Sequence, residues 1–73
     1  DLEKDMKISA RNQIKGTVLD VVKGATTAHV KIDVGGGAVI TASITNESAE
    51  ELGLKKGMQA TAIIKSSDVI VGV

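Results

Sequence analysis

The sequence contains no cysteine and no aromatic residue. Without cysteine the chain has neither a disulfide framework nor a thiolate metal site, and its single histidine, His29, cannot form a multi-histidine site within one subunit. Without Phe, Tyr or Trp, the core must be built from Val, Ile, Leu, Ala and Met. A chain of 73 residues buries only about 60% of its unfolded surface. We therefore expect association between copies to supply part of its stability.

Neither sign of charge is in excess, because nine basic residues face nine acidic ones. Most nucleic-acid-binding domains combine a basic surface with aromatic side chains that stack on bases, and this chain lacks both. No apolar run approaches the roughly 20 residues that a membrane-spanning helix needs, and no signal peptide is apparent. We expect a cytoplasmic protein with neither nucleic acid nor membrane among its partners.

The first five residues, Asp-Leu-Glu-Lys-Asp, look unlike the rest of the chain and precede Met6. We expect Met6 to be the natural start and residues 1–5 to be a cloning remnant or a disordered start. Residues 6–73 then form a single domain.

Three segments in the first two thirds of the chain have the pattern of strands. Residues 14–22 are rich in β-branched side chains and apolar on both faces, as in a central strand or one at a subunit contact. Gly16 inside this segment marks a bend or a close backbone approach. Residues 27–34 alternate strictly between apolar and polar side chains, which places His29 on a solvated face.

Three glycines at 35–37 connect that strand to the third segment, residues 38–44. Glycine tolerates the positive φ of tight turns, so the glycines predict a hairpin. A phosphate-binding P-loop would instead require Gly-Lys-Ser/Thr at the start of a helix, and here a strand follows.

The single helical signal covers residues 45–54, with Thr45 as the N-cap, Glu47 in the first turn and Gly53 at the end. Residues 58–65 and 69–73 follow as a fourth strand and a short fifth one. This order of elements predicts an all-β fold, a five-stranded OB-like barrel with one short helix between strands 3 and 4.

Hydrogen-bond donors gather in three stretches, which contain no carboxylate apart from Glu47 in the first turn of the helix. The first, just before the first strand, offers a hydroxyl, a guanidinium and amide N–H groups. The second is the start of the helix and the third is the end of the fourth strand; both add hydroxyls, and the third adds a lysine. In chain order the residues of the three stretches are Ser9, Ala10, Arg11 and Asn12; Thr45 and Ser48; Lys65 and Ser66.

A fully deprotonated tetrahedral oxyanion presents only acceptors, so a site made only of donors suits it. A protonated phosphate would also require an acceptor, such as a carboxylate. The donor set therefore favours a dianion such as sulfate, molybdate or tungstate. Catalysis is not expected: Lys65 beside Ser66 resembles at most a Ser-Lys dyad, and nothing supplies an oxyanion hole.

The first stretch with the residues after it resembles the opening motif of the molbindins, the small molybdate-binding Mop proteins with a Mop/TOBE-type domain. The motif reads Ser-Ala-Arg-Asn-Gln-Ile-Lys-Gly over residues 9–16. The resemblance continues through Ile-Thr-Asn-Glu-Ser at 44–48, Leu-Gly-Leu at 52–54, Gly57, and Ile-Lys-Ser at 64–66.

This resemblance implies an OB-like subunit that assembles into a homo-hexamer, a trimer of dimers, with anion sites between subunits. It also implies a role in the storage or homeostasis of molybdate or tungstate, with no organic cofactor and no metal bound directly by side chains. The positions that match the family's binding residues are Ser9, Ala10, Arg11, Asn12, Thr45, Ser48, Lys65 and Ser66.

Two other functions remain open at this point. One is an OB-fold module for single-stranded nucleic acid, of the cold-shock or S1 kind, which shares the expected fold. The other is an assembly module whose donors serve only subunit contacts.

Overall fold

The structure is a computed structural model that describes residues 7–73. The predictions of a non-native start at 1–5 and a natural start at Met6 lie outside the described residues. The described elements, in chain order, are β1 (Asn12–Lys23), β2 (Thr27–Gly35), β3 (Ala38–Thr45), α2 (Asn46–Glu51), β4 (Gln59–Ile64) and the 3₁₀ turn η1 (Ser66–Asp68).

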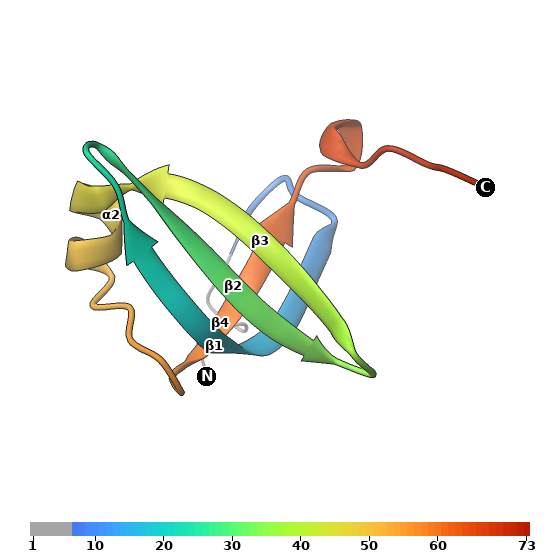
Figure 1. The fold of residues 1–73 in the computed structure, drawn as a ribbon. Helices are drawn as coiled ribbons and strands as arrows, with labels where there is room; N and C mark the ends of the chain where they lie inside the picture. Colours follow the sequence, from blue (N-terminus) through green and yellow to red (C-terminus); the bar gives the residue numbers. More distant parts are fainter. Residues whose placement is uncertain (1–6) are drawn as a thin grey trace.

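The four strands form one antiparallel sheet in the order β3-β2-β1-β4. Figure 1 shows the sheet curled, with β4 crossing behind β2 and β3. The prediction of a mostly-β, OB-like architecture is confirmed in this coarse form. The helix follows β3 and precedes β4, and it is shorter than expected, ending at Glu51.

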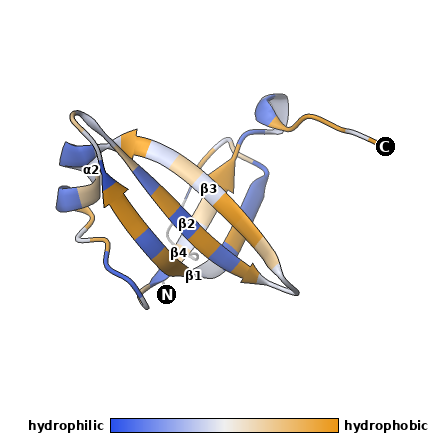
Figure 2. Ribbon diagram, in the orientation of Figure 1, coloured by the Kyte–Doolittle hydropathy of each residue, from blue (hydrophilic) through white to orange (hydrophobic). Residues whose placement is uncertain are grey.

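The strict alternation of β2 places its apolar side chains in the core, as predicted. Ala28, Val30 and Ile32 are buried, whereas His29 is exposed. Figure 2 shows the same alternation as orange and blue bands along the strand. The buried core of small aliphatic side chains consists of Val18, Val30, Ile32 and Ala62.

The imperfect alternation of β1 has a structural cause, a register shift against β2 between Val18 and Asp20. A bulge of this kind inserts one residue and so reverses which face the following side chains occupy. Val18 is therefore buried and Val21 packs against the same core, while Leu19 is exposed between them.

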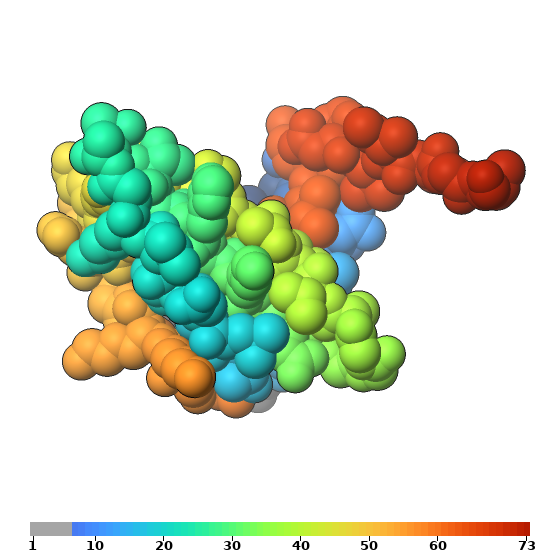
Figure 3. Space-filling model, viewed as in Figure 1, coloured from blue at the N-terminus to red at the C-terminus, as the bar shows by residue number. Residues whose placement is uncertain are grey.

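The predicted fifth strand over residues 69–73 is not confirmed, because the segment carries no strand pairing. Lys65 and Val69, which flank η1, both have extended backbone, with ψ of 143° and 123°. The turn therefore does not send the chain back along β4. Figure 3 shows the end of the chain, in red, projecting from the body of the subunit. We call residues 69–73 the C-terminal tail.

Gly16 occupies a close backbone approach, as the sequence predicts. A Cβ atom there would lie 2.5 Å from the Asp33 carbonyl oxygen and 2.6 Å from Ile32 Cγ2. Both distances are far below van der Waals contact, and the first involves backbone that cannot rotate away.

We therefore expect Gly16→Ala to destabilise the fold by about 1–3 kcal/mol, the usual cost of overpacking a core. Urea unfolding at one fixed protein concentration measures the change. Ser43→Ala, an exposed substitution in β3, is the control and should fall within about 0.5 kcal/mol of the parent. Equal stability of the Gly16→Ala variant and the parent would contradict the close approach.

Candidate oxyanion-binding site

The first and third donor stretches meet at one end of the β1–β4 pair. Asn12 is the register partner of Ile64, and its side-chain Nδ2 donates to the Ile64 carbonyl oxygen at 3.1 Å. Arg11 directly precedes the first of these residues and Lys65 directly follows the second. Antiparallel pairing therefore brings the only two cations of the predicted site to the same end of the sheet.

Both cationic side chains are exposed and lack partners within residues 7–73. Neither the Arg11 guanidinium nor the Lys65 ammonium makes a hydrogen bond or ion pair with this part of the chain. Asp68, in the adjoining turn η1, also forms no ion pair with either of them. Arg11 and Lys65 each lie one residue beyond the last register pair of β1 and β4, so their like charges repel each other and an anion bound between them would relieve that repulsion.

The two residues before Arg11 have different roles: Ala10 fixes the backbone, and Ser9 offers a hydrogen-bond donor. Ala10 is buried, with 6% of its surface exposed, and its carbonyl oxygen accepts from Gln13 Nε2 at 3.4 Å. Ser9 lies next to this anchor and is exposed. The motif thus presents a hydroxyl and a guanidinium to solvent from either side of a fixed backbone position.

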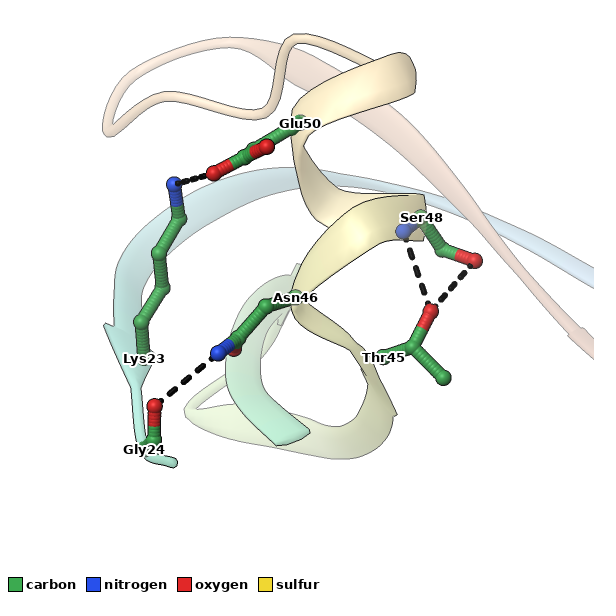
Figure 4. A network of polar contacts seen from close by, with 6 residues as sticks. All are labelled: Lys23, Gly24, Thr45, Asn46, Ser48 and Glu50. Atoms are coloured by element: carbon green, nitrogen blue, oxygen red, sulfur yellow. Dashed lines mark hydrogen bonds and ion pairs between the residues drawn. The ribbon is translucent and has the colours of Figure 1, made fainter. Parts of the chain in front are cut away.

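The second stretch is organised around the start of α2. The Thr45 Oγ1 atom accepts from the Ser48 backbone N–H at 3.0 Å, which makes Thr45 the N-cap, as predicted. The Thr45 hydroxyl in turn donates to Ser48 Oγ at 2.9 Å (Figure 4). The capping pair therefore leaves the hydroxyl hydrogen of Ser48 as the donor that can serve a ligand.

Two further contacts hold α2 in place against the β1–β2 turn. Asn46 Nδ2 donates to the Gly24 carbonyl oxygen at 2.9 Å, and Lys23 Nζ lies 3.2 Å from Glu50 Oε1 (Figure 4). The Asn46 Oδ1 atom is buried without a hydrogen-bond partner among the described residues. These contacts are structural, and none of them was predicted from the sequence.

One subunit does not bring all three stretches together. Thr45 ends β3, while Lys65 follows β4, and these strands are the opposite edges of the sheet. Figure 1 shows α2 on the opposite side of the view from η1. Within one subunit the open sheet therefore separates the second stretch from the other two.

Asn12, one of the predicted binding residues, also has a structural role that its sequence context did not indicate. One of its amide hydrogens is used in the bond to Ile64, which fixes the two strand ends that carry Arg11 and Lys65. The signal available in the sequence was only its position at the start of a strand. Its amide therefore positions the two cations, whatever else it contacts.

Within 7–73 no group of three or more His, Asp or Glu side chains is placed to hold a metal ion. No helix in the same range is long and apolar enough to cross a membrane.

Comparison with known proteins places this geometry in context. The family model of the TOBE domain matches residues 8–71. Molybdenum-pterin-binding protein 1 of Clostridium pasteurianum is 52% identical over 66 residues, which cover 90% of this chain and 97% of that protein.

Two solved structures have the same fold. MopII from Clostridium pasteurianum, in an apo form, superposes with a TM-score of 0.85 at 48% identity, covering 92% of this chain and all of that one. The cytoplasmic molybdate-binding protein ModG, with molybdate bound, gives a TM-score of 0.90 at 45% identity. That match covers 97% of this chain and 50% of the ModG chain.

Proposed function

The chain belongs to the TOBE-domain family and, within it, to the molbindin (Mop) proteins, and on this premise we propose that it binds molybdate, and also tungstate, without catalysis. The observation that carries the proposal is the pair of cations at one end of the β1–β4 pair, Arg11 and Lys65, which have no partner among residues 7–73. The similarity to a ModG structure that holds molybdate supports the same ligand here.

The chemistry of the donor set defines the class of anion. Arg11 supplies a planar fork of N–H donors and Lys65 a compact point charge, so together they match the charge of a dianion. Ser9, Ser48 and Ser66 add hydroxyls that can donate to its oxygens. Sulfate has the same charge but is smaller, so a cage set for molybdate makes poorer contacts with it.

The proposed site lies between subunits. Thr45 and Ser48 lie at the opposite edge of the sheet from Arg11 and Lys65 of the same chain, so a second copy would supply them, with Ser48 carrying the hydroxyl hydrogen that can serve the anion. We propose the homo-hexamer, a trimer of dimers, as the assembly that does this. Exposed apolar side chains such as Leu19, Val22 and Leu52 provide surface for such contacts.

The proposed role is storage or buffering of molybdate in the cytoplasm. Binding of single-stranded nucleic acid, the alternative that the sequence left open, is not supported. The related proteins are named for molybdenum compounds, and this chain has neither basic excess nor aromatic side chains.

Calorimetry combined with native mass spectrometry tests the proposal. We expect molybdate and tungstate to bind in whole numbers per assembly, and sulfate to bind at least about tenfold more weakly, a difference of about 1.4 kcal/mol. The absence of binding at millimolar molybdate would overturn the proposed function. Full-affinity binding to a single subunit would overturn the proposal that the site is shared between subunits, but not the proposal that molybdate is the ligand.

A further inference from the structure

Little of the helix α2, which carries Ser48, is buried against the sheet. The helix has six residues and buries only Ala49, and Leu52 at its end is 62% exposed. A helix of fewer than two turns is not stable by itself, so contacts with the rest of the fold decide its position. The contacts at the start of α2 therefore also decide where the Ser48 hydroxyl lies.

Asn46, the first residue of α2, donates two hydrogen bonds to the β1–β2 turn. Its backbone N–H donates to the Thr26 carbonyl oxygen at 2.9 Å, and its Nδ2 donates to the Gly24 carbonyl oxygen at 2.9 Å (Figure 4). The turn has a closing bond of its own, from the Gly24 N–H to the Thr27 carbonyl oxygen at 2.8 Å. The Asn46 side chain therefore ties the start of the helix to a backbone segment that is already fixed.

The oxygen of the same amide shows that the fold uses the side chain as a donor. Asn46 Oδ1 is buried and has no hydrogen-bond partner among residues 7–73, and a buried acceptor without a donor costs free energy. Turning the amide over would bring this oxygen against the Gly24 carbonyl oxygen, and two acceptors cannot bond to each other. The bond from Nδ2 to Gly24 therefore sets the orientation of the amide.

The second side-chain contact described above, between Lys23 and Glu50, is a weaker tie. The two side chains are 47% and 66% exposed, and an exposed ion pair contributes little because water and salt screen it. Of these two contacts, the Asn46 bond is the one that fixes the start of α2.

We propose that Asn46 is a positioning residue of the oxyanion site, because its amide fixes the direction in which Ser48 offers its hydroxyl hydrogen. The inference rests on the proposed function, in which Ser48 of one copy completes the site of another. Asn46 lies between Thr45 and Ser48, and the Thr45 hydroxyl donates to Ser48 Oγ at 2.9 Å. A shift of the helix start therefore moves this capping pair together. Asn46 acts through the pair and is not itself a ligand.

A double-mutant cycle measured by calorimetry tests whether Asn46 acts through Ser48. Asn46→Ala removes the amide but introduces a strong helix former. We expect it to weaken molybdate binding about three- to tenfold, the effect of one hydrogen bond. In a protein that already carries Ser48→Ala, the same replacement should change the affinity less than about twofold, because the donor that Asn46 positions is gone.

The control for the cycle is Gln59→Ala. It removes another exposed amide, which donates to Thr17 Oγ1 at 3.3 Å between β1 and β4, and leaves the net charge unchanged. Its molybdate affinity should stay within about twofold of the parent. Equal losses from Asn46→Ala with and without Ser48 would overturn the proposal, because Asn46 would then act by another route. Unchanged affinity of the single Asn46→Ala variant would overturn it as well.

Hydrogen exchange without any anion separates this inference from the proposed function. The Leu52 N–H donates to the Ser48 carbonyl oxygen at 3.0 Å, so its exchange rate, followed by NMR, reports how firmly the helix is held around Ser48. We expect Asn46→Ala to raise this rate at least about threefold. Gln59→Ala should leave it unchanged.

The exchange rates and the binding data together identify which proposal fails. An unchanged Leu52 rate in Asn46→Ala would refute the positioning role and leave molybdate binding by the parent unaffected. If the rate rises but the parent protein does not bind molybdate, the proposed function fails, and the positioning role fails with it.

Discussion

Replacing Lys65 by alanine is expected to weaken molybdate binding at least tenfold and to leave the fold intact. A charge-assisted hydrogen bond contributes about 1.5–3 kcal/mol, which corresponds to roughly a 10- to 150-fold change in affinity. The side chain makes no contact that the fold needs, because Lys65 caps η1 through its backbone and not through its ammonium group.

Calorimetry at fixed ionic strength measures the change in affinity, and urea unfolding checks that the fold is kept. Lys55→Ala is the matched control, because it removes an exposed lysine from the segment between α2 and β4 and alters the net charge equally. If both variants bind molybdate as tightly as the parent, Lys65 is not a ligand. If both weaken binding equally, the effect belongs to net charge and not to a local contact.

The fold was predictable from the sequence where the pattern of a single strand shows which of its side chains are buried. β2 alternates strictly, because one of its faces is covered and the other is solvated, and the three glycines at 35–37 place the hairpin without further information. β1 is harder, because its bulge at Leu19 reverses the alternation midway, and a bulge depends on the partner strand. The C-terminal tail is hardest of all, because its strand-like composition does not reveal whether an edge of the sheet is available to pair with it, and in the structure it pairs with none.

The candidate site was likewise predictable where it depends on local sequence, and not where it depends on how the strands are arranged. The residue types predict a dianion that only accepts hydrogen bonds, since that inference needs only a set of candidate residues that supply donors and include no carboxylate. Which donors share a site is a matter of sheet order, which local sequence does not encode. Register places Arg11 beside Lys65, whereas Thr45 and Ser48 lie at the other edge. Their capping contact could be predicted, because it joins residues three positions apart.

Arg11→Ala should have the largest effect on binding, a loss of roughly 100-fold in molybdate affinity. Its guanidinium can make two parallel hydrogen bonds to one anion, and each is charge-assisted. Arg11→Lys keeps the charge but loses the fork, so we expect an affinity between those of the parent and the alanine variant. Lys31→Ala, on the exposed face of β2, removes one charge elsewhere and serves as the control.

The dependence on salt separates the two parts of the arginine effect. Attraction between an exposed charge and the dianion is screened by salt, so the parent should lose affinity as ionic strength rises and Arg11→Ala should lose less. Arg11→Lys should keep the salt dependence of the parent at a lower affinity, because the charge remains and only the geometry changes. If the lysine variant binds as tightly as the parent at every ionic strength, the guanidinium acts only as a point charge. The expectation that its paired N–H donors contribute to affinity would then be wrong.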